Sequence, residues 1–298
     1  GQNANNSVRV NDAFMTALAE DRDFDLTRRT DGAVAKTVKA KALWDDISTT
    51  AWTCADPGLQ FHDTINSWHT CPTGGAIRAS NPCSEYMFLD DTACNLASLN
   101  LAKFRTQGGF DAGAFEHACR LWTLALEISV AMAQFPSPEI ARRSHDYRTL
   151  GLGFANLGGL LMSSGLAYDS AEGRSIGAAV SSLMTGAAYR ASAEMAASLG
   201  PFPRFKENRE PMLRVLRNHR RAAIGPRVAG AFEDLNLKPQ IFNANACPWD
   251  GLSERAQTIW NEAYELGGIS GFRNAQVTAV APTGTIGLVM DCDTTGIE

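Results

Sequence analysis

Two short apolar runs that pass directly into helical sequence constrain the fold of this chain most. The stretch YRTLGLGFANLGGLLMSSG, residues 147–165, begins with a short buried run and continues with the spacing of a helix. The stretch NAQVTAVAPTGTIGLVMD, residues 274–291, gives a strand, a turn and the start of a helix in the same order. This order is typical of α/β proteins, so we predict a helix-rich α/β fold with short buried strands.

Longer periodic stretches predict the helices around these strands. Apolar residues at helical spacing predict helices over residues 112–134, 172–199 and 253–266. The second of these is rich in Ala and Ser, which gives it a small-residue face that permits close packing. Residues 9–52 also look helical, with Asp12 as the N-terminal cap.

Proline and glycine clusters predict the irregular parts of the chain. Residues 53–82 are expected to form loops, and residues 84–101 a strand or a tight connection into the next helix. Residues 200–248 are expected to be irregular, with PFPRFKENREP as a surface loop.

Composition and charge exclude several classes of protein. The 298 residues are 45% hydrophobic and 20% charged, which is ordinary for a globular protein with a sizeable core. The net charge of -5 and the scattered lysines and arginines, apart from a short run at 217–221, offer no surface for nucleic acid. No apolar stretch reaches about 18 residues, and seven cysteines are too few for a disulfide scaffold. We therefore expect a cytoplasmic protein without nucleic-acid or membrane partners.

The turn APTGTIG, residues 281–287, follows the β-branched run VTAV. Its backbone N–H groups and hydroxyls, with a helix dipole behind them, suit a phosphate. It lacks the lysine and the spacing of a P-loop. From the residues alone, an ordinary strand-to-helix turn and a phosphate site both stay open.

The cysteines do not have the spacing of a metal site. Cys71, Cys83 and Cys94 contain no CxxC pair, and His62 and His69 do not complete a tetrahedral set. We predict no metal ligands.

A cysteine nucleophile for acyl transfer stays open, because His62 and His69 could act as a base for Cys83. Glu85, two residues after Cys83, argues against it, since a neighbouring negative charge raises a thiol pKa. Cys119 is interpreted as a packing thiol.

The set Asn81, Cys83 and Glu85 has a spacing of its own. In an extended loop, alternate side chains point the same way, so amide, thiol and carboxylate would converge on one small volume. Such a volume suits a polyol whose hydroxyls contact the carboxylate and the amide. A sulfur beside a carbon that is not electrophilic suggests hydrogen-atom abstraction by a thiyl radical.

Four segments, in this order, together resemble the catalytic component of ribonucleotide reductase: WTCADPGLQFHDTINSWHTCP, SNPCSEYMFLDDTACNLASLNL, YRTLGLGFANLG and APTGTIGLVMDCDTTGIE. The resemblance covers essentially the whole chain. NPCSEY and PTGTI favour the adenosylcobalamin-dependent class II enzymes over class I, which shares only the Asn-x-Cys-x-Glu core. A class I large subunit, whose radical comes from a partner subunit, is the alternative.

The resemblance implies roles for the residues of the loop. Cys83 would become the thiyl radical that takes the 3'-hydrogen of the ribose. Glu85 would deprotonate the 3'-hydroxyl and assist loss of the 2'-hydroxyl as water, and Asn81 would hydrogen-bond in the same region. Cys94 would be one of two cysteines that supply electrons and end as a disulfide.

The resemblance also implies how the substrate is held. The substrate would be a ribonucleoside di- or triphosphate whose phosphates bind the turn at Thr283, Gly284, Thr285 and Ile286, largely through backbone amides. Ser80 is expected to contact the substrate as well.

The implied fold is part of a ten-stranded α/β barrel with a central finger loop, of the glycyl/thiyl radical enzyme type. Residues 1–298 would be one partial catalytic barrel domain, with the finger loop at about 78–95 and the phosphate-binding turn at 281–287. The chain has no initiator Met and stops at DCDTTGIE, so we expect a fragment of a longer protein.

Several parts of the family's machinery are expected to lie outside this chain. The second reducing cysteine and the effector loops would lie upstream, and a C-terminal cysteine pair downstream, so neither Cys54 nor Cys71 takes the redox role. The full enzyme would use a thioredoxin-type reductant and could form a homodimer. The fragment alone is expected to be inactive, as a nucleotide-phosphate-binding or inert piece.

Ala55 departs from the family pattern, which has glycine at this turn. We expect little effect if the backbone there has a negative φ.

Overall fold

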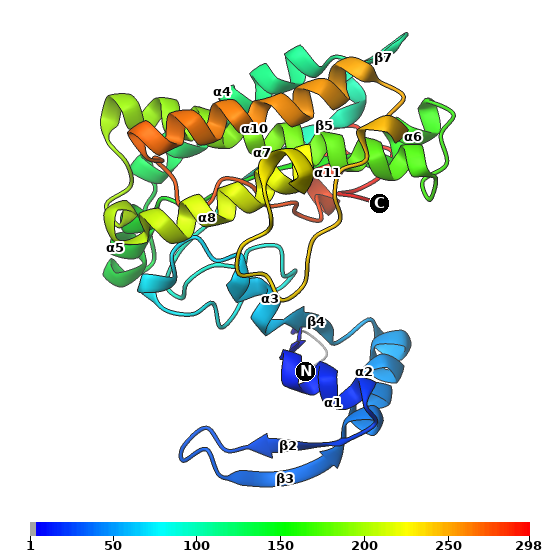
Figure 1. Ribbon diagram of the computed structural model, residues 1–298, viewed down its shortest axis with the longest axis vertical. Coiled ribbons are helices and arrows are strands. Elements are labelled where there is room, and N and C mark those ends of the chain that lie inside the picture. The colour runs from blue at the N-terminus through cyan, green and yellow to red at the C-terminus, as the bar shows by residue number, and fades with distance from the viewer. Residues whose placement is uncertain (1–3) are drawn as a thin grey trace.

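The computed structural model describes residues 4–298, which form a small N-terminal region and a larger helical body (Figure 1). The N-terminal region contains β1 (Ser7–Val10), α1 (Asp12–Ala19), β2 (Asp23–Thr27), β3 (Val34–Lys39), α2 (Ala40–Cys54) and β4 (Gly58–Phe61). β1 and β4 pair in parallel, and β2 and β3 form an antiparallel hairpin. These blue elements lie at one end of the molecule in Figure 1.

The N-terminal region has a small core of its own. Phe14 of α1 meets Phe24 of β2 edge to face, with ring centroids 5.2 Å apart. Val10, Ala17 and Ala40 are buried beside them. This cluster fixes the hairpin and the two helices as one unit.

The prediction of helix over residues 9–52 is wrong in its middle. Residues 23–39 form the β2–β3 hairpin, because DFDLT and VAKTVK flank a turn in which Gly32 has a φ of +72°. The cap is also one residue earlier than predicted. Asn11, not Asp12, accepts a hydrogen bond from Phe14 N through its Oδ1 atom, at 2.9 Å.

The condition under which Ala55 would have little effect, a negative φ, is not met. Ala55 ends α2 with a φ of +64°, and its N–H donates to Ala51 O at 2.9 Å. The left-handed conformation places a Cβ too close to the next carbonyl, at a cost of roughly 1–2 kcal/mol for a residue other than glycine.

We predict that Ala55→Gly stabilises the N-terminal region by about 1 kcal/mol, because glycine removes this strain. The same substitution inside the helix, Ala51→Gly, is the matched control and should destabilise by about 1 kcal/mol. Hydrogen exchange of the α2 amides measures both changes in the full-length protein. Two changes of the same sign would contradict the assignment of strain to Ala55.

The helical body contains the remaining elements. They are α3 (His62–Ser67), the 3-10 turn η1 (Pro72–Gly74), β5 (Asn95–Asn100), η2 (Leu101–Phe104), β6 (Arg105–Thr106), β7 (Gly109–Phe110), α4 (Ala112–Met132), α5 (Pro138–Tyr147), β8 (Leu150–Ala155), α6 (Leu157–Ser163), α7 (Ala171–Leu199), α8 (Phe205–Ile224), α9 (Pro226–Ala229), η3 (Ala244–Ala246), α10 (Asp250–Ser270) and α11 (Gly284–Val289). The predicted helices at 112–134, 172–199 and 253–266 and the strand-to-helix order at 150–163 are confirmed.

Three parallel extended segments form the centre of this body. β5 pairs in register with β8, and residues 276–279 follow the other edge of β8. On that edge Leu150 N donates to Gln276 O at 2.8 Å and Leu152 N to Val277 O at 3.0 Å. All six residues of β8 are buried, as expected for a parallel strand covered on both faces.

The helix-rich α/β class is confirmed, and the strands of residues 4–298 form two-stranded pairs. The strand pairings of these residues do not close into a barrel. No helix in this part of the chain is both long enough and apolar enough to cross a membrane.

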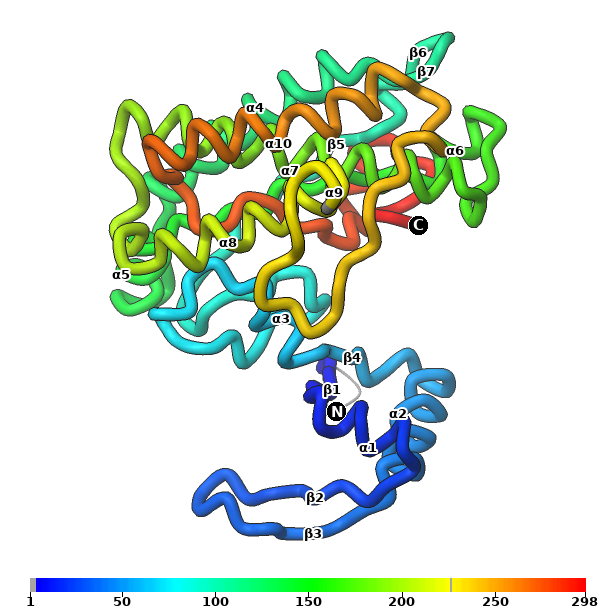
Figure 2. The backbone as a smooth tube through the Cα atoms, in the orientation of Figure 1, coloured from blue at the N-terminus to red at the C-terminus, as the bar shows by residue number. Residues whose placement is uncertain are grey.

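Three long helices, α4, α7 and α10, lie side by side over the strands (Figure 2). The small residues of α7 permit the close packing predicted from the sequence. At Gly186, for example, a Cβ atom would lie 2.6 Å from the Ile259 side chain of α10. Substitution of this glycine would push the two helices apart.

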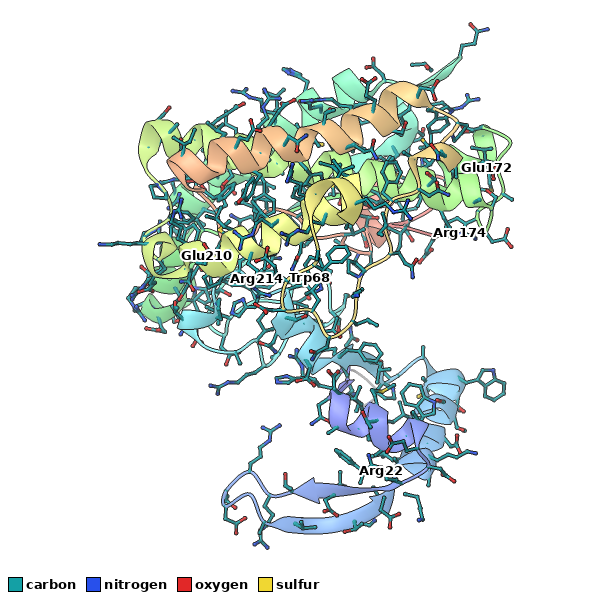
Figure 3. All side chains as sticks on the ribbon, in the orientation of Figure 1. Arg22, Trp68, Glu172, Arg174, Glu210 and Arg214 are labelled. Atoms are coloured by element: carbon teal, nitrogen blue, oxygen red, sulfur yellow. The ribbon has the colours of Figure 1, made fainter. Side chains whose placement is uncertain are left out.

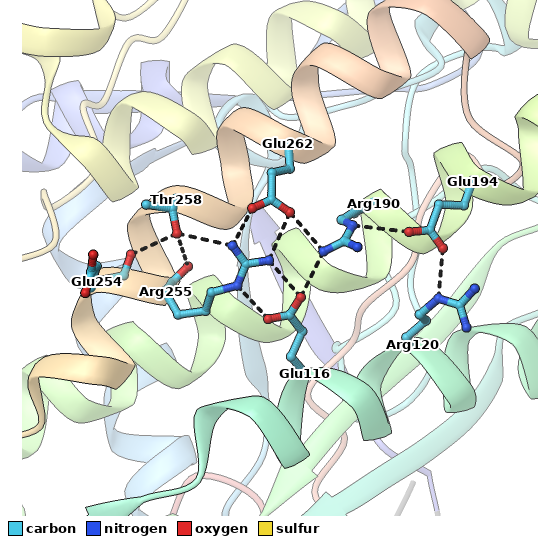
Figure 4. A network of polar contacts seen from close by, with 8 residues as sticks. All are labelled: Glu116, Arg120, Arg190, Glu194, Glu254, Arg255, Thr258 and Glu262. Atoms are coloured by element: carbon cyan, nitrogen blue, oxygen red, sulfur yellow. Dashed lines mark hydrogen bonds and ion pairs between the residues drawn. The ribbon is translucent and has the colours of Figure 1, made fainter.

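A charge network crosses the outer side of these helices (Figure 4). Arg255 of α10 donates to Glu116 of α4 at 2.6 Å, and Arg190 of α7 donates to Glu262 of α10 at 2.8 Å. The Arg255 guanidinium lowers the pKa of Glu262 below its usual range. Positive and negative charges alternate through the network, so it stabilises the helix packing without a net charge.

A second, buried network joins α4 to the strands. The Glu127 carboxylate accepts from Arg148 Nε at 2.7 Å, from Arg273 Nε at 2.8 Å and from Asn274 Nδ2 at 2.7 Å. The side chain of Glu127 is 5% exposed and that of Arg148 is 7% exposed. One buried carboxylate therefore pairs with two guanidinium groups from different segments.

The prediction that residues 200–248 are irregular is wrong for the first half. Residues 205–224 form α8, although Pro211 lies inside it. Buried residues recur at helical spacing along α8, at Phe205, Met212 and Leu216, so packing outweighs the missing backbone donor of the proline.

α8 supports the segment that leads into the finger loop. Asn208 Oδ1 accepts from Thr73 Oγ1 at 2.7 Å, and Arg214 donates to Ser67 O at 3.0 Å. Figure 3 shows Arg214 beside Trp68 at this junction. The entry to the loop is therefore anchored on the helical body.

Candidate functional site

The tip of the finger loop is a turn. Ser84 N donates to Asn81 O at 3.1 Å, and Ser84 has a φ of +66°. The Oδ1 atom of Asn81 accepts from Tyr86 N at 2.9 Å. The premise that this loop is extended is therefore wrong, and strict alternation of side chains does not apply to it. Cys83 lies in the turn as an exposed, free thiol.

Glu85 leaves the turn toward the interior. Its Oε2 atom is buried and has no hydrogen-bond partner among the described residues. Buried carboxylate oxygens nearly always have a partner, so this atom is positioned to accept a hydrogen bond from a ligand.

Cys94 lies at the end of the loop and immediately precedes β5. Burial, and to a lesser extent the negative charge of Glu85, raises the pKa of the Cys94 thiol to about 12. Gly151 of β8 makes room for it, since a Cβ atom there would lie 2.4 Å from Cys94 Sγ. Cys94 is therefore a protonated thiol at neutral pH, within range of the electrostatic effect of Glu85.

We predict that Cys94 in the folded full-length protein reacts with iodoacetamide about 1000-fold more slowly at pH 8 than in the denatured protein. A pKa of about 12 leaves roughly one thiolate in 10,000 at this pH, whereas an ordinary cysteine has about a quarter. Peptide mapping after timed alkylation measures the rate, which should rise about tenfold per pH unit toward pH 12.

Glu85→Gln is the control for this prediction, because it removes the negative charge and should speed the labelling of Cys94. A labelling rate that levels off below about pH 10 would contradict a strongly raised pKa.

Tyr86 ties the loop to the start of β8. Its hydroxyl hydrogen-bonds Thr92 Oγ1 at 2.9 Å and Thr149 Oγ1 at 2.8 Å. Burial raises the pKa of this phenol above its usual range. Tyr86 therefore stays a neutral hydrogen-bonding group that holds the loop against the strand.

The turn at 281–287 has two different kinds of residue. Thr283 is buried with a φ of +52°, and its Oγ1 donates to Pro282 O at 2.8 Å and accepts from Gly296 N at 2.6 Å. Gly284, Thr285 and Ile286 are exposed and begin α11, where the first N–H groups have no intrahelical acceptor. The Thr283 hydroxyl holds the turn, and the exposed backbone that follows is available to an anion.

The predicted site has two parts, the finger loop and the turn at 281–287, and they lie at opposite ends of the parallel strands. Cys94 precedes the first residue of β5, whereas the turn follows the carboxyl end of the segment beside β8. Six residues of parallel strand separate these ends by roughly 20 Å. A ligand that contacts both Glu85 and the turn has to lie along the strands.

Two asparagines hold the carboxyl ends of the strands to the segment after α11. Asn100 Nδ2 donates to Met290 O at 3.0 Å, and Asn156 Nδ2 donates to Asn100 Oδ1 at 3.1 Å. Asn156 Oδ1 accepts from Thr294 N at 3.0 Å. These bonds fix the turn relative to β5 and β8.

Among residues 4–298, no group of three or more His, Cys, Asp and Glu side chains is arranged to hold a metal ion. A cleft of about 920 Å³ lies between the N-terminal region and the stem of the finger loop, and Arg78, Ala79 and Asp90 contribute to its lining.

The family model described as ribonucleotide reductase, barrel domain, matches residues 1–298. The chain belongs to this family. The resemblance inferred from the sequence is therefore confirmed.

Relatives extend the match to cobalamin-dependent enzymes. The chain is 59% identical to the vitamin B12-dependent ribonucleotide reductase of Agrobacterium fabrum over 300 residues, which are 100% of the chain and 23% of that protein. It is 57% identical to the enzyme of the same name from Bradyrhizobium diazoefficiens, and the match covers 100% of the chain and 24% of that enzyme. It is 31% identical to the vitamin B12-dependent ribonucleoside-diphosphate reductase of Mycobacterium tuberculosis, and the match covers 99% of the chain and 34% of that enzyme. The chain thus spans about a quarter of the length of the first two relatives.

Sequence reasoning missed the residues that support the finger loop. Gln60 is buried and hydrogen-bonds two serines of the loop, and Arg9 binds Gln60 from β1. A polar Gln in the apolar strand GLQF was the available signal for the first. Arg9 gave no comparable signal, because its partners lie far along the chain.

Proposed function

We propose that the full-length protein of which this chain is part reduces ribonucleotides to 2'-deoxyribonucleotides by thiyl-radical chemistry dependent on adenosylcobalamin. The observation that carries the proposal is the unpaired, buried Glu85 Oε2 atom, on a loop whose tip presents the free Cys83 and whose end carries the Cys94 thiol within electrostatic range of Glu85. A hydrogen-bond acceptor, a protonated thiol and an accessible thiol are three of the groups that this reaction requires.

The residues of the loop act in sequence in this proposal. The Cys83 thiyl radical takes the 3'-hydrogen atom from the ribose, which forms the S–H bond and leaves a radical on carbon. The Glu85 carboxylate accepts the proton of the 3'-hydroxyl, which assists departure of the 2'-hydroxyl as water. Cys94 and a second thiol outside this chain supply two electrons and two hydrogens, one to the departing water and one to C2', and become a disulfide. Glu85 then returns its proton to the 3'-oxygen, and Cys83 returns the hydrogen atom to C3', which restores the thiyl radical.

The raised pKa of Cys94 supports its part in this sequence. A thiol with a pKa of about 12 keeps its proton at neutral pH and has a hydrogen to deliver to the leaving group or the sugar. Asn81 orients the site indirectly as well, since its side chain already closes the turn through Tyr86 N.

The phosphates of the substrate bind the exposed turn in this proposal. Gly284, Thr285 and Ile286 offer the N-terminal N–H groups of α11, and the positive end of the helix favours an anion. Thr283 contributes the shape of the turn rather than a free hydroxyl.

Cys83 fits the cofactor requirement, because its thiol is exposed and unbonded and so can be approached by a large group. Adenosylcobalamin supplies the radical that oxidises this thiol when it is bound. The role of this chain is to present the Cys83 sulfur and to keep Cys94 protonated.

We extend the proposal to the whole protein on the basis of the family. The finger loop and the three parallel segments would belong to a closed ten-stranded α/β barrel that other parts of the full-length protein complete. The full-length protein would be cytoplasmic, would be re-reduced by a thioredoxin-type protein and would form a homodimer.

Turnover of the purified full-length protein tests the proposal. We expect formation of 2'-deoxyribonucleotide from a ribonucleoside di- or triphosphate with a dithiol reductant, only when adenosylcobalamin is added. Reduction without the cofactor, but with a metal-containing partner subunit, would favour the class I alternative. The isolated 298 residues should be inactive, because they do not contain the second reducing cysteine.

A further inference from the structure

We infer that Arg9 and Gln60 form a clamp that positions the tip of the finger loop, and with it Cys83, for radical transfer. The two residues are positioning residues in this inference, since they act through the loop. The inference deepens the proposed function and rests on it.

Gln60 occupies the centre of the clamp. The residue is 6% exposed, and its Nε2 atom donates to Ser80 Oγ at 2.7 Å and to Ser84 Oγ at 2.9 Å. These serines flank Cys83 on both sides, three residues before it and one residue after it. One amide group therefore fixes both ends of the turn that carries the thiol.

Arg9 fixes Gln60 from the neighbouring strand. Arg9 lies opposite Gln60 in the parallel β1–β4 pair. Its Nε and Nη2 atoms donate to Gln60 Oε1 at 3.0 and 2.7 Å. This fork leaves the amide one orientation, with its NH₂ group toward the serines.

The same guanidinium reaches the stem of the loop. Arg9 Nη1 donates to Ile77 O at 2.7 Å, and Asn66 binds the same residue through both Ile77 N and Ile77 O, at 2.9 and 3.1 Å. Burial lowers the pKa of Arg9, and the negative charge of Asp90 opposes this effect. Stem and tip are thus held by one continuous set of hydrogen bonds that starts in the N-terminal region.

The clamp requires an amide. Only a group that accepts from arginine and donates to hydroxyls can make all of these bonds, and a carboxylate has no hydrogen to donate. Ser80 Oγ has already given its own hydrogen to Asn81 O, at 2.8 Å. Ser80, expected from the resemblance to contact the substrate, is therefore engaged with the protein and helps to hold the loop.

The turn needs such support because Ser84 is held in the left-handed region, with a φ of +66°. A residue other than glycine relaxes from this region unless its surroundings hold it. Displacement of a reacting group by about 1 Å typically lowers the rate about 100-fold. Loss of the clamp should therefore reduce turnover much more than substrate binding.

The test uses Gln60→Glu and Gln60→Met in the full-length protein. Gln60→Glu keeps the length of the side chain and its pairing with Arg9 but replaces the donating NH₂ group by a charged carboxylate oxygen. Gln60→Met removes every hydrogen bond of the side chain. Gln257→Met is the matched control, because Gln257 is a partly buried residue of α10 that donates to Ala223 O at 3.3 Å, outside the loop.

Two readouts are measured for each variant. We expect kcat for ribonucleotide reduction to fall about 100-fold while KM stays within about twofold. Independently of activity, we expect hydrogen exchange at the amides of Ile77, Ser84 and Tyr86 to accelerate about tenfold. The Gln257→Met protein should match the wild type in both.

Unchanged kcat, or exchange in the loop no faster than in the control, would overturn the inference. Exchange that accelerates equally in α2, β5 and the loop would also overturn it, since Gln60 would then be a residue of general stability. A wild-type protein that reduces no ribonucleotide under any condition would refute the proposed function, whereas the exchange measurement would still report on the clamp.

Discussion

Replacing Cys83 by serine in the full-length protein is expected to abolish ribonucleotide reduction while leaving nucleotide affinity within about threefold. Serine fills nearly the same space at the exposed tip of the loop, but its O–H bond is too strong to be converted to the oxygen radical. Product formation under saturating substrate and cofactor, and equilibrium binding of the nucleotide, measure the two quantities.

Cys54→Ser is the control for this experiment. Cys54 is also an exposed free thiol, at the end of α2, and its Sγ atom donates to Thr50 O at 3.2 Å. The control protein should turn over at the wild-type rate. Residual reduction by the Cys83→Ser protein at a substantial fraction of that rate would remove Cys83 from the reaction.

Removing the carboxylate of Glu127 is expected to destabilise the helical body by about 3–5 kcal/mol. Glu127→Ala leaves the buried Arg148 and the partly buried Arg273 without their counter-charge. The effect should appear as faster hydrogen exchange at Leu150 and Leu152, whose amides bond to the adjacent segment 276–279.

Glu139→Ala provides the contrast. Glu139 also pairs with an arginine, Arg142, at 2.6 Å, but both side chains are about half exposed. Water replaces such a contact readily, so exchange at the strand amides should not change. Equal effects of Glu127→Ala and Glu139→Ala would show that the buried network does not stabilise the strands.

The fold was predictable wherever local pattern and packing agree. The helices at 112–132, 171–199 and 250–270 show in the sequence because buried residues recur on one face. The order of β8 and α6 shows because an apolar run meets a helical one. In contrast, α8 contains a proline, and only the contacts of its buried face explain why it remains helical.

The residue types of the candidate site were predictable from the sequence, but the hydrogen bonds that hold the loop in place were not. The spacing of Asn81, Cys83 and Glu85 can be read from the sequence. The turn that presents these residues cannot, because the alternation of side chains applies only to an extended loop. The bonds of Gln60 to Ser80 and Ser84 join residues 20 and 24 positions apart, and no local propensity encodes them.

The Ala55 backbone shows the same limit on a smaller scale. A resemblance identified the missing glycine, but only the structure shows that the residue has a φ of +64°. The local strain is tolerated at an exposed helix end, where the N–H of Ala55 still bonds to Ala51 O.

Competition between a ribonucleotide with deuterium at the 3' position and the unlabelled ribonucleotide tests the central claim most directly. If the Cys83 radical takes the 3'-hydrogen, the full-length protein with adenosylcobalamin should consume the unlabelled substrate faster, because the C–H bond breaks more readily than the C–D bond. Product that forms without preference from the two substrates would contradict abstraction at this position.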